Sequence, residues 1–331
     1  MGRKSAMLRM NKSIQALLTC PACHKKLHVS DSQLACSNSG CAVIYPVVNG
    51  VPILINEQAS IFSIDDIVSS QKAVAAKSAD KMARLSDATR FIPNPNRNVG
   101  ARKNNATFLD CLLQSNPNPR VLVLGGGTVG EGMEVLIQSQ PPVELIETDI
   151  YFGPRTMIIC DAHDIPFPDN SLDGVIVQAV LEHVVDPAKC ASEIHRILKP
   201  GQGIVYAETP FMQQVHMGRY DFTRFTHLGH RRLFRKFEEI DSGAACGPGM
   251  ALAWAYEYFL LSFAETAFLR KTAKAFARFT GFWLKYFDTF LINKPGTMDA
   301  ASSYYFIGRK TDKTISDKEL IQQYRGALKV D

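Results

Sequence analysis

The sequence predicts an α/β protein with a doubly wound, mostly parallel sheet, a small N-terminal domain and a helical insert before the last strand. From residue 120 onward, short apolar β-branched runs alternate with helical spacers. This alternation is typical of βαβ units, whose parallel strands carry helices on both faces. Four of the eight cysteines lie within the first 41 residues, and this cluster predicts the small domain.

The predicted elements follow one another in a regular order. Strands are expected over residues 121–124, 143–148, 157–160, 172–178 and 203–208, with helices over 131–138 and 187–198. A last strand over 302–308 reads as an edge strand. The chain then divides into a basic tail (1–15), the cysteine-bearing domain (16–56), a helical linker region (57–117), the main domain (118–310) with a loop and helical insert at 209–295, and a C-terminal tail (311–331).

Composition sets broad limits on function. The chain is 46% hydrophobic and 21% charged, as in an ordinary globular protein, and its formal net charge is +5. This mild excess favours an anionic partner, such as nucleic acid, acidic sugar or lipid headgroup, or simply describes a slightly cationic enzyme. Residues 1–12 carry no apolar run of a signal peptide, so we expect a cytoplasmic protein with reduced thiols.

The clustered cysteines form two pairs on tight turns, Cys20 with Cys23 and Cys36 with Cys41. Two thiolate pairs aimed at one point suit a tetrahedral zinc ion. So short a segment lacks the core to fold alone, and metal binding contributes on the order of 10 kcal/mol. We expect structural zinc; free cysteines or two disulfides are the alternatives.

Residues 14–56 resemble the small zinc-ribbon protein that activates several tRNA and rRNA methyltransferases. The likeness rests on the CPAC turn, the second cysteine turn and the closing run YPVVNGVPILI at 45–55. Four residues separate Cys36 from Cys41, where that family has two. A four-cysteine site has no open coordination position, so the resemblance implies a structural metal.

A glycine-rich turn, with Gly125, Gly126, Gly127 and then Gly130, follows the first strand of the main domain. Such a turn lets the backbone approach a ligand closely, and the next helix N-terminus suits a carboxylate or phosphate. Asp149 ends the second strand, where a carboxylate accepts hydrogen bonds from ribose hydroxyls. These residues alone fit a nicotinamide dinucleotide as well as S-adenosylmethionine.

Three further motifs help to distinguish between these two ligands. They are DAHDIPFPD at 161–169, VLEHV at 180–184 and RILKPG at 196–201. Together with the glycine turn they resemble the class I methyltransferase family that includes the ubiquinone- and menaquinone-pathway enzymes. The likeness covers residues 118–210. It implies a Rossmann-like methyltransferase fold with a seven-stranded sheet, and S-adenosylmethionine as methyl donor.

The resemblance also implies roles for particular residues. The glycines would pass under the methionyl part of the donor, and Asp149 would hold its ribose. Asp161 and Ala162 would contact adenine, and Gln178 would line the site near the sulfonium. Val123 stands where the family has an acidic residue, and the glycine loop is one residue longer. A catalytically inactive copy is therefore the alternative.

Methyl transfer from a sulfonium needs few catalytic side chains, because in-line alignment of the reactants supplies much of the rate acceleration. A general base is needed only if the acceptor loses a proton during attack, and His183 and His216 are the candidates. His183 is equally suited to cap its turn. The motif typical of amide and exocyclic-amine methylation is absent, since QAVL stands at 178–181.

The acceptor side is expected in the loop at 210–232, which interleaves aromatic and polar residues without helical periodicity. In this fold, ligands bind beyond the carboxyl ends of the strands, where this loop must lie. We expect an acceptor lid with contacts from Tyr220, Arg224 and His227. A hydrogen-bonded loop whose arginines face solvent is the alternative.

Residues 251–293 are strongly apolar and aromatic. On a helical projection one side carries the aromatic residues Phe268, Phe276, Phe279, Trp283, Tyr286, Phe287 and Phe290, and the other side carries Arg270, Lys274, Arg278 and Lys285. This pattern fits packing in the core or at a homodimer interface, and also a helix lying peripherally in a membrane interface. Glu257 and Glu265 argue against a membrane span.

Three functions remain compatible with the sequence. The first is methyl transfer from S-adenosylmethionine to a small-molecule, glycan or lipid acceptor. The second is an rRNA or tRNA methyltransferase, since bacterial rRNA enzymes also combine a zinc ribbon with this core. However, the sequence has no basic patch with interleaved aromatic residues of the kind expected for an RNA-binding surface. The third is a non-catalytic scaffold whose ribbon docks a partner.

Overall fold

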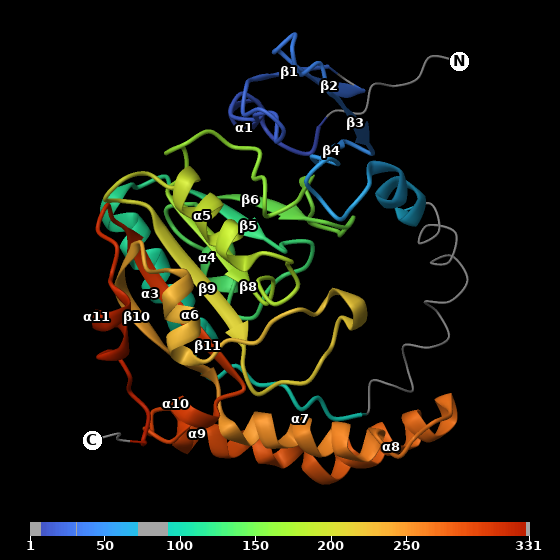
Figure 1. Ribbon diagram of the computed structural model, residues 1–331, viewed down its shortest axis with the longest axis vertical. Coiled ribbons are helices and arrows are strands. Elements are labelled where there is room, and N and C mark those ends of the chain that lie inside the picture. The colour runs from blue at the N-terminus through green and yellow to red at the C-terminus, as the bar shows by residue number, and fades with distance from the viewer. Residues whose placement is uncertain (1–7, 31, 72–91, 329–331) are drawn as a thin grey trace.

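A single sheet runs through the molecule, as the computed structural model of residues 8–30, 32–71 and 92–328 shows (Figure 1). It has eleven strands in the order β1-β2-β3-β4-β7-β6-β5-β8-β9-β11-β10. The main-domain strands are β5 (Arg120–Leu124), β6 (Glu144–Asp149), β7 (Ile158–Cys160), β8 (Gly174–Gln178), β9 (Ile204–Pro210), β10 (Phe237–Cys246) and β11 (Ser303–Lys310). Strands β5 to β9 are parallel, and β11 is antiparallel to both β9 and β10.

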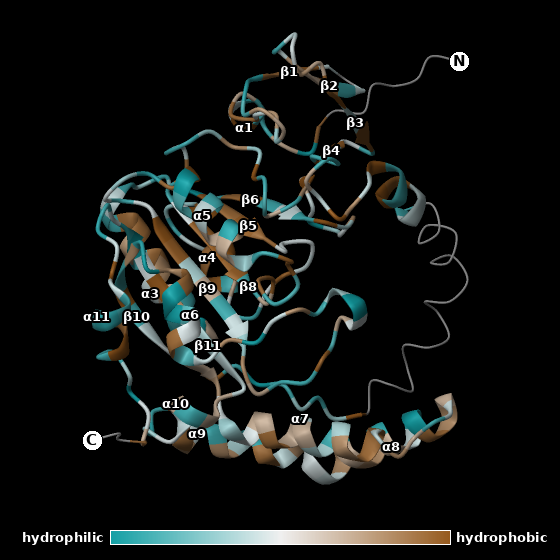
Figure 2. Ribbon diagram, in the orientation of Figure 1, coloured by the Kyte–Doolittle hydropathy of each residue, from teal (hydrophilic) through white to brown (hydrophobic). Residues whose placement is uncertain are grey.

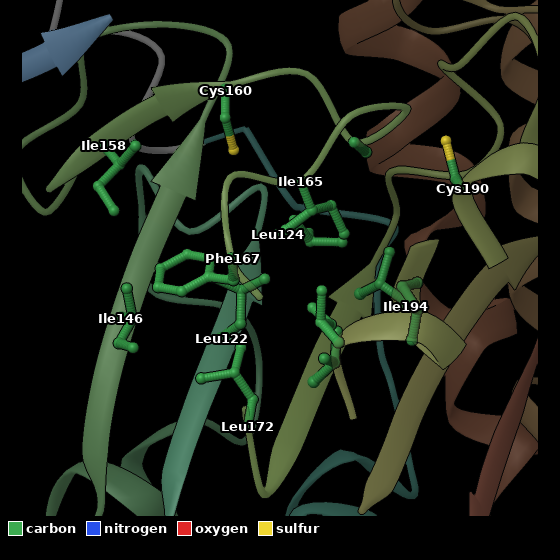
Figure 3. Close-up of a cluster of buried hydrophobic side chains, with 14 of the residues drawn as sticks. Leu122, Leu124, Ile146, Ile158, Cys160, Ile165, Phe167, Leu172, Cys190 and Ile194 are labelled. Carbon is green, nitrogen blue, oxygen red and sulfur yellow. The ribbon is translucent and has the colours of Figure 1, made fainter. Parts of the chain in front are cut away.

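Helices cover both faces of this sheet, as expected for a doubly wound fold. Alternate residues of β5 enter different clusters: Leu122 and Leu124 pack in one and Val121 and Val123 in the other. Helix α5 (Pro187–Ile197) supplies Cys190 and Ile194 to the first cluster, shown in Figure 3, and α3 (Ala101–Ser115) supplies Phe108 and Leu112 to the second. The short α4 (Glu134–Ile137) and α6 (His227–Leu233) complete the layers.

The cysteine-bearing domain is part of the same sheet. Its strands are β1 (Leu27–Val29), β2 (Gln33–Cys36), β3 (Ile44–Val48) and β4 (Val51–Leu54), preceded by α1 (Lys12–Gln15). Strand β4 pairs in parallel with β7, with Ile53 opposite Ile159 and Leu54 opposite Cys160. Backbone hydrogen bonds therefore join this domain to the main one.

Two expectations about the sheet were wrong. The sheet has eleven strands rather than seven, because the N-terminal domain extends it. Strand β11 is not an edge strand: it lies between β9 and β10, and β10 forms the edge. Strand β10 lies within the segment expected to be loop and helix, because its sequence FEEIDSGAAC has acidic and small residues and little β-branched character.

The terminal and linker segments also differ from expectation. Residues 8–15 are not a loose tail, because Leu8, Met10 and Ile14 are buried in the main core cluster. Of the helical linker region, residues 64–71 and α3 are helical, and 72–91 lie outside the described residues. The helix expected over 131–138 is shorter than predicted and comprises only α4, Glu134–Ile137. The C-terminal segment contains a helix, α11 (Asp317–Ile321), whose Leu320 is buried.

The helical insert forms a hairpin of α7 (Pro248–Leu261) and α8 (Ala267–Gly281), followed by η2 (Phe282–Phe287), α9 (Asp288–Leu291) and α10 (Thr297–Ala300). Figure 2 shows hydrophobic residues along this hairpin. The seven aromatic side chains expected on one side are 49–75% exposed, so they do not pack in the core of this chain. Among the described helices, none combines the length and apolar character needed to cross a membrane.

Replacing Ile53 tests the contact between the two domains. We expect Ile53→Ala to lower the free energy of unfolding by about 2–4 kcal/mol, because Ile53 is fully buried against Ile159. The matched control is Ile44→Ala, since Ile44 is 55% exposed in the same domain and should cost less than about 0.5 kcal/mol. Urea unfolding followed by circular dichroism measures both; equal costs would contradict the packing described here.

Candidate functional site

The parallel register brings three chain segments to one edge of the sheet. Leu124 lies opposite Thr148 of β6 and Val177 of β8, so the turns after β5, β6 and β8 emerge side by side. A cavity of about 440 Å³ opens there. Its lining comprises Phe62, Leu124, Gly125, Thr148, Asp149, Ile150, Tyr151, Cys160, Asp161, Ala162, Ala179, Val180, His183, Val184, His216, Met217 and Tyr220.

Gly125 makes the turn at the floor of this cavity. Its φ of +73° lies in the left-handed region, and a Cβ atom at this position would lie 2.5 Å from Cγ2 of Val180. The next residue, Gly126, donates its N–H to the carbonyl of Thr148 at 2.8 Å. Only glycine satisfies both the backbone angle and the close approach.

The Asp149 carboxylate is oriented entirely by backbone amides. Oδ2 accepts the N–H of Gly127 at 3.0 Å, and Oδ1 accepts those of Ile150 and Tyr151 at 2.7 and 3.2 Å. The glycine turn therefore positions this carboxylate as well as leaving room for a ligand. Its remaining lone pairs suit hydroxyl donors.

A second carboxylate, Asp161, lies in the same cavity and is buried. Oδ2 accepts the hydroxyl of Ser60 at 2.5 Å, and Oδ1 accepts the His163 N–H at 3.0 Å. Burial alone would raise the pKa of Asp161, but the hydrogen bonds from His163 and Ser60 outweigh it and lower that pKa below its usual value. Asp161 is therefore an ionised acceptor at neutral pH.

The loop after β9 contributes His216, Met217 and Tyr220 to the cavity lining. Tyr220 lines the cavity and its ring lies 5.7 Å from that of Phe62. Helix α7 supports the loop, because the Tyr258 hydroxyl donates to the carbonyl of Val215 at 2.6 Å and Trp254 lies edge-on to His216. The loop is thus placed where an acceptor lid was expected.

Both histidines expected to act on the acceptor line this cavity. The rings of His183 and His216 lie 4.8 Å apart, and the Nε2 atoms lie 3.6 and 3.8 Å from Oε1 of Glu182. Burial lowers the pKa of His183, so its ring is neutral at neutral pH. Burial raises the pKa of Glu182 to about 8.

Other expected site residues lie elsewhere. Gln178 and Gly130 line two neighbouring cavities of about 30 and 240 Å³ instead. Arg224 is outside the described cavity linings: its guanidinium pairs with Asp221 and donates to the Gln213 carbonyl at 2.8 Å. His227 is buried at the start of α6 beside Tyr304, and burial lowers its pKa to about 4. The structure therefore does not bring Arg224 or His227 to the cavity.

Sequence reasoning missed several residues of the site. Ser60 and Phe62 follow β4 and reach the cavity from the linker region, where nothing in the local sequence marks them. Tyr151 follows the second strand and was overlooked. Glu182 stands next to His183 in the VLEHV motif, and an acidic residue beside a candidate histidine was the available signal.

The four N-terminal cysteines converge as expected. All four Sγ atoms lie within 4.8 Å of one another, with Cys23 and Cys36 at 3.4 Å and Cys20 and Cys41 at 3.8 Å. These distances exceed the roughly 2.05 Å of a disulfide. Four thiolates at about 2.3 Å from one zinc ion would lie about 3.8 Å apart, so the cluster fits that ion.

Part of this chain is similar to known proteins. Residues 139–206 match the family model described as a methyltransferase domain. The chain is 28% identical over 132 residues to the ubiquinone/menaquinone biosynthesis C-methyltransferase of Geotalea daltonii, covering 34% of this chain and 52% of that protein. The corresponding protein of Geobacter sulfurreducens is 32% identical over 105 residues, covering 27% of this chain and 41% of that one.

The chain thus spans about half or less of the length of these curated relatives. A solved complex between the Trm112 methyltransferase activator of Haloferax volcanii and a methyltransferase aligns with a TM-score of 0.34 and 18% identity, over 63% of this chain and 90% of that one. Part of this chain is therefore similar to a methyltransferase domain and to the named methyltransferases.

Gly125→Ala should destabilise the protein more than Gly201→Ala. Both glycines have a positive φ, which costs an alanine about 1–2 kcal/mol, but nothing lies within 4 Å of a Cβ at Gly201. The alanine at position 125 must also displace Val180, which should add about 1–3 kcal/mol. Urea unfolding of both variants checks the difference, and equal losses would argue against the tight turn.

Proposed function

We propose that this protein transfers the methyl group of S-adenosylmethionine to a small-molecule acceptor. One observation carries the proposal: a single cavity at the carboxyl ends of the parallel strands combines the Gly125 turn with the carboxylates of Asp149 and Asp161. Its volume of about 440 Å³ lies within the range of small-molecule sites, about 300–1,000 Å³.

Each part of the donor has a suitable partner in this proposal. Asp149 accepts hydrogen bonds from the ribose hydroxyls, and Asp161 accepts from the adenine amine beside Ala162. The methionyl part lies over Gly125, where a side chain would intrude. The acceptor enters under Tyr220, opposite His183 and His216, and the aromatic lining favours an acceptor with an apolar portion, such as a lipid or a glycolipid.

Asp149→Asn should weaken binding of S-adenosylmethionine by about 10- to 100-fold, because a hydrogen bond to a charged acceptor contributes about 1.5–3 kcal/mol. The matched control is Asp169→Asn, which makes the same amide change at a carboxylate that is 69% exposed and outside the cavity. Isothermal titration calorimetry measures both. If the wild-type protein fails to bind the donor, the proposal is refuted and the scaffold function is favoured.

We propose in addition that Cys20, Cys23, Cys36 and Cys41 hold a structural zinc ion. The sulfur distances support this, as does the N–H of Asn38, which donates to Sγ of Cys36 at 3.4 Å. Four thiolates complete the coordination of the ion, so it would stabilise the fold of the ribbon and take no part in catalysis.

The exposed aromatic side of the hairpin supports a peripheral membrane contact. Its counterpart, the basic side of α8, partly faces the protein: Arg278 and Lys274 pair with the buried Glu257 at 2.8 and 3.7 Å. Phe268 and Phe276 are left 73% and 57% exposed, with Lys271 exposed beside them. Aromatic side chains with nearby cations suit the interface of an anionic bilayer. A homodimer through the same face is the competing arrangement.

A vesicle flotation assay distinguishes these arrangements. We expect the wild-type protein to float with vesicles containing an anionic phospholipid, and the Phe268→Ser/Phe276→Ser variant to bind at least tenfold more weakly, because each large apolar side chain contributes about 1.5–3 kcal/mol when buried. The control is Ile321→Ser, which alters an equally exposed apolar residue on α11. A wild-type protein that stays unbound but sediments as a dimer would favour the homodimer.

A further inference from the structure

The cluster of Glu182, His183 and His216 differs from an ordinary buried network, because it gathers acceptors without a donor. The Glu182 side chain is fully buried, and neither of its oxygens has a hydrogen-bond partner among the described residues. Leaving a buried carboxylate unpaired costs several kcal/mol unless a cation or a proton compensates it. Either a bound cation or a proton on Glu182 must therefore compensate this carboxylate.

A backbone carbonyl fixes the tautomer of each histidine and leaves Nε2 as the nitrogen nearer the Glu182 carboxylate. Nδ1 of His183 lies 2.8 Å from the carbonyl oxygen of Tyr220, and Nδ1 of His216 lies 3.2 Å from that of Gln214. A carbonyl only accepts, so each Nδ1 carries the proton, and in a neutral ring Nε2 is then the unprotonated nitrogen. Histidine ligands of metal ions commonly donate their second N–H to a backbone carbonyl in this way.

We propose that Glu182, His183 and His216 bind a divalent transition-metal ion through Oε1 and the two Nε2 atoms. The three ligand atoms lie within 4.8 Å of one another, and the two nitrogens lie 3.6 and 3.8 Å from the oxygen. Ligands at about 2.1 Å from one ion lie about 3.0–3.4 Å apart, so both nitrogen–oxygen distances would shorten by a few tenths of an ångström when the ion binds. Two imidazoles and a carboxylate suit Fe²⁺, Mn²⁺, Co²⁺ or Zn²⁺.

The position of the cluster indicates what this ion does. His183 and His216 line the 440 Å³ cavity and Glu182 lines the 240 Å³ cavity, so the ion lies where the linings of the two cavities meet. Three protein ligands leave coordination positions open, as in catalytic rather than structural sites. This step rests on the proposed methyl transfer: the open positions hold an oxygen of the acceptor, which places a hydroxyl- or carboxylate-bearing compound in front of the methyl donor.

Metal stoichiometry tests the site without an activity assay. The full-length chain is dialysed anaerobically against Fe²⁺, Mn²⁺, Co²⁺ or Zn²⁺ singly, washed, and analysed by mass spectrometry for metal content. With at least one of these ions, we expect the Glu182→Gln and His216→Ala variants to hold one equivalent less than wild type. The control is His195→Gln, which changes a half-buried histidine that donates to the Thr311 carbonyl far from the cluster; it should retain the ion.

Thermal melting separates loss of the ion from loss of the fold. Glu182→Gln replaces a buried carboxylate with a neutral side chain of the same shape, so this variant should fold. Added ion should raise the melting temperature of wild type and leave that of Glu182→Gln unchanged. Equal metal content in wild type and Glu182→Gln for all four ions would overturn the site, and a shared proton would then neutralise Glu182. Calorimetry with S-adenosylmethionine alone tests the proposed function separately.

Discussion

The parallel register of β5 between β6 and β8 is the constraint on which the site depends. Leu124 lies opposite both Thr148 and Val177, so the chain leaves all three strands at one level. This common exit lets the amide of Gly127 reach Asp149 and brings Val180 against Gly125. A shift of one residue in the pairing of β5 with β6 would separate the turn from the carboxylate it orients.

The parts of the structure that follow from local sequence were predictable. The five parallel strands are apolar β-branched runs bounded by turns, and Gly125 and Asp149 are linked to the ends of such runs. Strand β10 was not predictable, because its acidic and small residues form a strand only through pairing with β11. The lid contacts Arg224 and His227 were inferred from loop composition, but Arg224 pairs with its neighbour Asp221 and His227 packs against Tyr304 of β11 instead.

Long-range contacts account for most of what sequence analysis missed at the site. Ser60 reaches Asp161 across 101 residues of sequence, and only the pairing of β4 with β7 brings them together. Glu182 is part of the VLEHV motif, but its role in the cluster depends on its contact with His216. His216 belongs to the loop after β9, which contacts α7. Motifs therefore located Gly125, Asp149 and Asp161, whereas tertiary packing brought Phe62 and His216 to the same cavity.

The pairing of β4 with β7 also means that each domain covers a sheet edge of the other. A main domain ending at β7 would expose the unpaired N–H and C=O groups of a buried parallel strand, which invites association with other chains. The cysteine-bearing domain moves that boundary to β1, a strand of three residues facing solvent. Loss of either domain would leave the other with an open sheet edge.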